Sequence, residues 1–417
     1  MKLATLSPEN LTATFLSIAI LLLMAFVCGK IFVIMKAPKV IGEILGGFIL
    51  GASGLYLVAP EFIGGIFNAY QEQGKVLNIF YHLGLIFLMF VAGFNTNISF
   101  EKQNLKIISW LFIGSTFIPM ALGYFFIDFF MEPYIGSVGS QFAFLLVFLI
   151  AIAVTSIPVI SKIFFDIGII KTRFASIVLT TSTIQDLFLW ILLNVAINAI
   201  LNKEISVIDN LWTATLTILL FIAVKILAKI FCHIKITMGS VDFFTLSFVC
   251  LFLAVALLNF LHINPMYSAF LVGFLVKNTL HNHDELKEKM QGVSDFSFSY
   301  FIPIYFALIG IQLDVVNDFS FLVFVAFLLM SCSLEFIGSY VGLLLVKINN
   351  ISRINFAITM NARGGPGIVL ASVAYYYEII NVNFFTALIL TTLLSSMLAG
   401  YWLRYQKNNN LEQFEKF

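Results

Sequence analysis

The chain has 417 residues, of which 60% are hydrophobic and 11% are charged, and its formal net charge is +1. Its mean hydropathy is +1.01, whereas an average soluble domain carries roughly 25% charged residues. This composition excludes a soluble nucleic-acid-binding protein, a secreted disulfide scaffold and a disordered chain, and it leaves a polytopic membrane protein.

Apolar segments of spanning length follow one another along the whole chain. A helix needs about 20 apolar residues to cross a bilayer, and barrel strands need only about 9–11 alternating ones. We therefore expect an all-α polytopic membrane protein with about thirteen spans. In chain order they are 11–34, 40–58, 76–94, 105–130, 141–165, 174–200, 211–231, 241–260, 265–280, 296–313, 319–346, 353–377 and 384–404.

The basic residues predict the orientation of these spans. When the N-terminus is placed outside and the C-terminus inside, most of the 23 Lys and Arg residues fall at the inner ends and in the inner loops. This asymmetry follows the positive-inside rule. The longest inner loop is 277–295, so we expect one transmembrane transporter domain over 1–417 without a soluble regulatory domain. Any regulatory subunit would be a separate chain.

Cofactor and metal sites are not expected. The four cysteines lie in or beside apolar segments without close pairing. His281, His283, Asp284 and Glu285 form a polar loop cluster, which we interpret as a solvated loop rather than a metal site.

Three ionisable residues fall in the middle of expected spans: Asp186, Glu335 and Arg363. A charged side chain at the bilayer centre costs at least roughly 2.5–3.5 kcal/mol on insertion scales, and such residues usually mark an ion or proton path. The alternative is an ion pair with a purely structural role inside the bundle, which applies above all to Arg363.

Asp186 has the most polar surroundings of the three. Ser182 and Thr183 precede it by four and three residues, so they share its face of a helix, and Gln185 is adjacent. Hard oxygen ligands suit a hard cation. A carboxylate that binds either a cation or a proton would couple the two by competition.

Two expected spans contain helix-breaking residues at mid-depth. The fifth contains Thr155, Ser156 and Pro158, and the twelfth contains Gly364, Gly365, Pro366 and Gly367 directly after Arg363. Proline removes a backbone donor, and such a glycine-rich run favours a bend or unwinding. A simple proline kink is the alternative, more plausible for the fifth span than for the twelfth.

The two broken spans are seven apart in the expected order, so they cross the membrane in opposite directions. Secondary transporters built from inverted repeats place their substrate between two such discontinuous helices. We therefore expect two inverted repeats with two discontinuous crossing helices, where Arg363 neutralises carbonyl ends or a nearby carboxylate.

Five sequence motifs resemble signatures of the monovalent cation:proton antiporters, in the branch that includes bacterial sodium/proton exchangers and potassium efflux systems. They lie in order along essentially the whole chain, at 37–47, 155–158 with 171–172, 185–186, 306–314 and 360–364.

The resemblance implies an elevator-type antiporter. Core helices would span about 76–200 and 296–404, and dimerisation or scaffold helices about 11–58 and 211–280. Asp186 would bind the ion and the proton. Gln185, Thr155, Ser156, Ser182 and Thr183 would belong to the same binding site, and Thr155 and Ser156 would lie at the crossover. A homodimer in the inner (plasma) membrane is implied.

Two residues depart from the pattern of that family. Many sodium-selective relatives carry an acid where this chain has Gln185, and a basic residue is frequent where it has Glu335. The two departures balance in charge, because the chain lacks the acidic residue at position 185 and also the basic residue at position 335. Glu335 is either a second proton-sensitive carboxylate or a protonated group that only forms hydrogen bonds.

The leading hypothesis is a secondary transporter that exchanges Na⁺ or K⁺ for H⁺ by alternating access in a lipid bilayer. A gated potassium efflux pathway without strict coupling and a sensor that reuses the fold are the alternatives. The sequence contains neither a His-Glu-x-x-His nor a Gly-x-Ser-x-Gly string, which argues against an enzyme.

Overall fold

The computed structural model is helical throughout its described part, apart from one isolated bridge between Ile135 and Ile380. It describes residues 5–35, 37–95, 104–170, 172–201, 207–231, 239–261, 263, 265–280, 283–316, 319–409 and 414–415. The chain divides into two compact units, 1–95 with 223–318 and 96–222 with 319–417.

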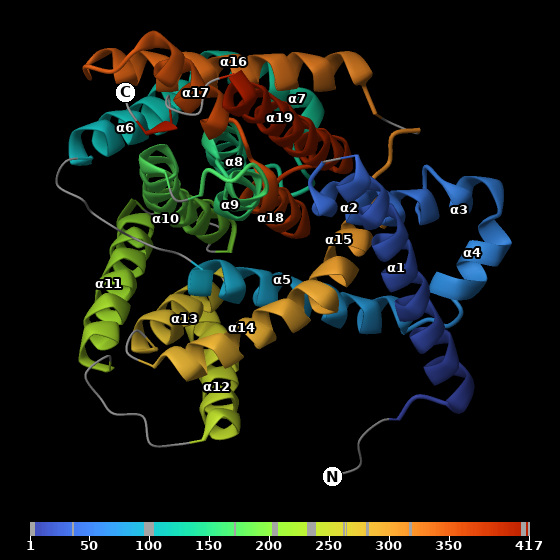
Figure 1. Cartoon of the computed structure of the whole chain (residues 1–417). Helices are drawn as coiled ribbons and strands as arrows, with labels where there is room; N and C mark the ends of the chain where they lie inside the picture. Colours follow the sequence, from blue (N-terminus) through green and yellow to red (C-terminus); the bar gives the residue numbers. More distant parts are fainter. Residues whose placement is uncertain are drawn as a thin grey trace. The chain divides into compact units, whose positions relative to one another are not determined.

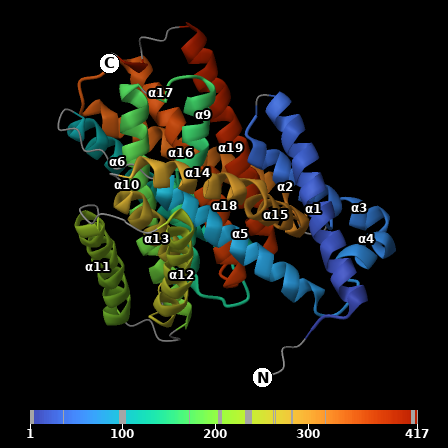
Figure 2. The same cartoon turned by 60° about the horizontal axis from the view of Figure 1, so that its bottom comes forward.

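The first unit combines N-terminal and central helices. It contains α1 (Pro8–Ile34), α2 (Lys39–Leu50), α3 (Leu55–Val58), α4 (Pro60–Phe67), α5 (Gln73–Asn95), α12 (Ser240–Phe260), α13 (Pro265–Thr279), α14 (Asp284–Ser299) and α15 (Phe301–Gln312). Helix α11 (Val207–Phe231) runs across the division between the units. Figure 2 shows α1 and α2 side by side, and α15 also packs on α2.

Glycines let α2 approach both of its neighbours. A Cβ atom on Gly42 would lie 2.3 Å from the carbonyl oxygen of Cys28 in α1, and one on Gly47 would lie 1.8 Å from that of Ala307 in α15. No larger residue fits at these contacts, which explains the glycines of the 37–47 motif by helix packing.

The second unit contains both broken spans (Figure 1). Its elements are α6 (Leu105–Gly123), the 3₁₀ turn η1 (Tyr124–Phe126), α7 (Ile127–Tyr134), α8 (Gln141–Ala153), α9 (Ile157–Asp166), α10 (Arg173–Leu201), α16 (Phe321–Leu344), α17 (Asn350–Met360), α18 (Gly364–Tyr376) and α19 (Val382–Asn409). Helices α8, α9, α10 and α18 lie next to one another.

Both expected helix breaks are present. Residues 154–156 separate α8 from α9, and residues 361–363 separate α17 from α18. Pro158 is the second residue of α9 and Pro366 the third of α18. The first turn of a helix has no internal acceptor for its N–H groups, so a proline there removes no hydrogen bond.

Nine helices of the described residues are long and apolar enough to cross a membrane. They include α14 and α15 together as one segment, Asp284–Gln312. The four other expected spans are the two broken ones, the 15-residue α13 and α11. The full count of thirteen is therefore not reached by uninterrupted helices alone.

One detail of the expected organisation differs from the structure. The polar stretch 284–299, expected in part as inner loop, forms the helix α14, in whose first turn Glu285 pairs with Lys289 at 2.6 Å. Helices α5 and α15, expected among the core helices, cluster with the first unit. Lys171, His281 and Asn282 lie outside the described residues, and only the backbone of Pro158 is described.

A short backbone clasp joins the loop before α8 to the loop after α18. Gly136 N–H donates to Ile379 O at 2.9 Å, and Asn381 N–H donates to Tyr134 O at 3.0 Å. The Asn381 side chain donates to Pro133 O at 2.8 Å and accepts from Phe384 N–H at 3.0 Å. The clasp ties together the ends of α8 and α18 that lie away from the breaks.

Candidate functional site

The two helix breaks cross and hold each other by hydrogen bonds. Ser156 N–H donates to Ala362 O at 2.6 Å, and the Thr155 hydroxyl donates to Met360 O at 2.7 Å. In return, Gly365 N–H donates to the Ser156 hydroxyl at 3.2 Å. Unwound backbone inside a membrane is tolerated only where other groups satisfy it, and here each break supplies those groups to the other.

Gly364 allows the closest approach at this crossing. Its φ is +36°, and a Cβ there would lie 2.2 Å from Val159 Cγ2 and 2.5 Å from Ser156 Oγ. Its N–H donates to Ser396 Oγ on α19 at 3.1 Å. Only glycine combines this backbone angle with this lack of space.

Glu335 and Arg363 meet beside the crossing as a buried ion pair. Arg363 Nη2 lies 3.1 Å from Glu335 Oε2, and the two side chains are 1% and 0% exposed. Arg363 also donates to Ile152 O, near the end of α8, at 3.2 Å, and to Cys332 Sγ at 3.4 Å. Both partners expected for Arg363, a free carbonyl and a carboxylate, are therefore in contact with it.

Thr155 connects this ion pair to the break in the fifth span. Its hydroxyl lies 3.1 Å from Glu335 Oε1 and 2.7 Å from Met360 O, and its single proton can serve one of them at a time. The hydroxyls of Thr155 and Ser156, expected at the ion site, are thus engaged in holding the crossing.

Gln185 is held by two neighbouring helices, α6 and α8, through its amide nitrogen. Nε2 lies 2.6 Å from Ala153 O at the end of α8, 3.2 Å from Ser115 O and 3.2 Å from Thr116 Oγ1 on α6. Its amide oxygen is buried and has no hydrogen-bond partner among the described residues. Gln185 therefore supplies the carbonyl at the broken end of α8 with a donor.

Asp186 is separate from these polar contacts. Its side chain is 5% exposed, and Oδ1 is buried without a hydrogen-bond partner in the described part of the chain. Ser182 Oγ, one turn earlier, is also buried without a hydrogen-bond partner among the described residues. The Thr183 hydroxyl, by contrast, donates to Leu179 O of its own helix at 2.8 Å.

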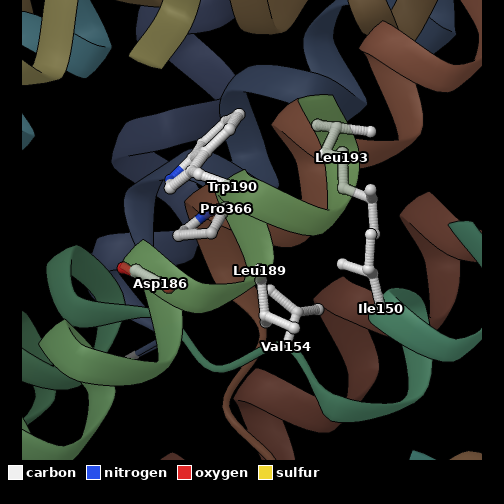
Figure 3. Close-up of a pocket in the computed structure, with 8 residues that line it drawn as sticks. Ile150, Val154, Asp186, Leu189, Trp190, Leu193 and Pro366 are labelled. Atoms are coloured by element: carbon white, nitrogen blue, oxygen red, sulfur yellow. The ribbon is translucent and has the colours of Figure 1, made fainter. Parts of the chain in front are cut away.

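A small pocket next to Asp186 lies between the two half-helices that end or begin at the breaks (Figure 3). It leaves room for about one water molecule. Its lining comes from α8 and the residue after it, from α10 and from α18: Ile150, Val154, Asp186, Leu189, Trp190, Leu193, Pro366 and Leu370. A carboxylate at such a place can exchange a proton for a cation.

Sequence reasoning missed four residues of this region. Ser115 and Thr116 form a polar pair in an otherwise apolar span, a signal of the same kind as the one used for Asp186. Trp190 follows Asp186 by one helical turn. Cys332 lies in an apolar segment, and nothing in the sequence indicates its contact with Arg363.

Comparisons with known proteins give a consistent result. A family model described as "Sodium/hydrogen exchanger, transmembrane" matches residues 18–405. The Na⁺/H⁺ antiporter NhaS4 of Synechocystis is 25% identical over 92% of this chain and 94% of its own length. An Na⁺/H⁺ antiporter of Enterococcus hirae is 23% identical over 88% of this chain and 91% of its own length.

Two further comparisons extend these matches. The K⁺/H⁺ antiporter 1 of Saccharomyces cerevisiae is 28% identical over 70% of this chain, which corresponds to 35% of that longer protein. The solved structure of the sodium proton antiporter MjNhaP1 from Methanocaldococcus jannaschii superposes with a TM-score of 0.67 at 18% identity. That superposition covers 95% of this chain and 98% of the other, and it shows a shared fold.

Proposed function

The chain belongs to the sodium/hydrogen exchanger family, and on that basis we propose that it exchanges a monovalent cation, Na⁺ or K⁺, for protons by alternating access. The relatives that match it are named as Na⁺/H⁺ and K⁺/H⁺ antiporters. This is a family of multi-pass membrane transporters rather than enzymes.

One observation supports Asp186 as the residue that binds the cation and the proton. Asp186 has a buried carboxylate oxygen that no described group hydrogen-bonds, and it lines a pocket between α8 and α18. A carboxylate whose partners are already supplied by the protein would have no need of a cation. Asp186 is free to take either a proton or a cation, and this competition couples the two fluxes. Ser182 and Thr183 are on the same helix face and complete the expected set of oxygens.

In this proposal Glu335 neutralises a positive charge beside the site and does not carry protons itself. Its carboxylate is paired with Arg363 and accepts from Thr155, so it neutralises a buried guanidinium next to the break. These contacts favour a Glu335 carboxylate that stays charged throughout the cycle over one that binds and releases a proton. A changed pH profile of exchange in a Glu335→Gln variant would instead support the hypothesis that Glu335 is a second proton-sensitive carboxylate.

The proposed topology has thirteen spans with the N-terminus outside and the C-terminus inside. The nine long helices, the two broken spans, α13 and α11 together make up that number. Spans two to six would be related to spans nine to thirteen as inverted repeats. The opposed helix breaks at residues 154–156 and 361–363 support this relation.

The resemblance to the family supports a proposal for the mechanism, the assembly and the location. We propose an elevator-type transporter that forms a homodimer in the plasma (inner) membrane. The core helices about 76–200 and 296–404 would carry the ion, and the helices about 11–58 and 211–280 would form the dimer.

Reconstitution into vesicles tests the exchange. Purified protein in proteoliposomes with an internal pH indicator should move protons when Na⁺ or K⁺ is added outside. Asp186→Asn should abolish this movement. Asp128→Asn, the same substitution at an exposed position of α7, should leave it unchanged.

The same vesicles separate exchange from a channel. Exchange continues to move cations against their own gradient while a proton gradient is imposed, whereas a channel lets cations flow only down their gradient. Normal exchange by Asp186→Asn would remove this residue from the mechanism, and cation flux indifferent to protons would reject antiport.

A further inference from the structure

Among the residues that line the pocket, Asp186 is the one whose side chain carries an oxygen atom. Ser182 Oγ and the Gln185 amide oxygen are also buried without a partner in the described residues, but neither residue belongs to the lining. Apart from Asp186 and the indole of Trp190, the lining consists of aliphatic side chains and a proline. The hydroxyls of Thr155 and Ser156 already take part in the crossing, and the Gln185 amide nitrogen binds α6 and α8. A cation in this pocket therefore exchanges its hydration shell for one carboxylate and mostly apolar walls.

The size of the pocket makes this exchange selective. Because there is room for about one water molecule, a cation that enters the pocket leaves most of its hydration shell behind. Removing that shell is hardest for Li⁺, easier for Na⁺ and easiest for K⁺ and Rb⁺, since a smaller ion of equal charge holds water more strongly. K⁺ also has nearly the radius of a water molecule, so it fills the space that exists.

Trp190 is the aromatic residue of the pocket lining. It follows Asp186 by four residues on α10, so both side chains project from one face of the helix. The side chain is 5% exposed. Figure 3 shows its indole near Pro366, on the side of the pocket where Asp186 lies, with Leu193 and Ile150 on the other side.

An indole is the best aromatic partner for a cation, and the attraction grows when water is excluded. We propose that this pocket selects weakly hydrated monovalent cations of the size of K⁺ over Na⁺ and Li⁺, with Trp190 as a specificity-determining residue. The inference rests on the proposed exchange at Asp186 and names its substrate.

Two readouts on the purified protein test the proposal. The first is the apparent KM of proton movement in proteoliposomes for K⁺, Rb⁺, Na⁺ and Li⁺ chloride at constant ionic strength. The second is the rise in thermal unfolding temperature in detergent with each of the same salts, which reports binding without transport. Wild type should show a lower KM and a larger thermal shift for K⁺ and Rb⁺.

Substitutions at Trp190 distinguish the effect of its aromatic ring on cation preference from the effect of its side-chain volume. Trp190→Leu should raise the KM for K⁺ by about two- to thirtyfold and change that for Na⁺ much less, so the K⁺ preference falls. Trp190→Phe keeps an aromatic face and should retain part of it. Trp110→Leu, the same change where Trp110 packs against the apolar cluster of the second unit, should leave the preference unchanged.

Each result has a defined meaning. A wild type that prefers Na⁺ or Li⁺ in both readouts overturns the inference about the substrate but leaves cation exchange in place. An unchanged K⁺ preference in Trp190→Leu removes Trp190 as its determinant. Absence of proton movement with every cation, together with no thermal shift, overturns the proposed function itself.

Discussion

Arg363 and Glu335 form an ion pair of 3.1 Å in which both side chains are almost completely buried. They belong to different helical spans, so the pair joins α16 to the break before α18. Removing one partner of a buried pair leaves the other charge uncompensated, whereas replacing both by apolar groups is often neutral or better.

The Glu335–Arg363 pair therefore predicts strong thermodynamic coupling. Glu335→Met and Arg363→Met should each lower the free energy of unfolding by about 3–5 kcal/mol. The double variant should recover most of that loss. Denaturant or thermal unfolding of the four proteins in detergent gives the coupling energy, and single variants as stable as wild type would contradict a buried pair.

Gln185 predicts an asymmetry between two substitutions of similar size. Gln185→Glu places carboxylate oxygens against Ala153 O and Ser115 O, where the amide now donates at 2.6 and 3.2 Å. It should reduce the free energy of unfolding by about 3 kcal/mol or more.

Gln185→Met is the matched control, because it removes the donor without adding a charge. It should be the less damaging change in a thermal unfolding measurement. Equal stability of the two variants would show that the amide donor is not what this position requires.

We expect alanine substitutions at two adjacent glycines to differ strongly in their effect on the free energy of unfolding. Gly364→Ala introduces a Cβ at a φ of +36° and 2.2 Å from Val159 Cγ2, so it should cost about 1–3 kcal/mol or more and impair exchange. A Cβ at Gly365 meets nothing within 4 Å.

Gly365→Ala should accordingly stay within about 0.5 kcal/mol of wild type. Thermal unfolding and vesicle transport of the two variants, compared in parallel, test the crossing geometry. A harmless Gly364→Ala would mean that the two breaks do not approach as closely as described.

Asn381 in the backbone clasp predicts a graded loss of stability. Asn381→Ala removes both the donor to Pro133 O and the acceptor for Phe384 N–H, and should cost about 1–2 kcal/mol. Asn381→Asp keeps the acceptor and loses only the donor, so it should be intermediate. If both variants unfold like wild type, the side chain adds nothing to the clasp.

The sequence was sufficient for features that follow from local chemistry. Proline and glycine at mid-span predicted both breaks, and the rarity of charge in apolar segments identified Asp186, Glu335 and Arg363. Which polar side chains hydrogen-bond to each other could not be predicted in the same way. Gln185 binds Ser115 and Thr116 some 69–70 residues earlier in the chain, a contact that depends on how α6 and α10 pack rather than on either segment.

Two other differences have similar physical reasons. The helix α14 has too few apolar residues to show a spanning signal, so its helical state was missed although its Glu285–Lys289 spacing is typical of a helix. The family resemblance places Thr155 and Ser156 at the ion site and at the crossover. Their hydroxyls also suit unpaired backbone groups, and the crossing uses them for that purpose.

The crossing of the two breaks also sets an order of events during synthesis. The Thr155 hydroxyl and its acceptor Met360 O are 205 residues apart in the chain. At about 5–20 residues per second, the ribosome needs about 10–40 s to reach the second break after making the first. Until then the polar groups of the first break lack the partners that the crossing gives them, so residues from the last third of the chain satisfy groups made in its middle third.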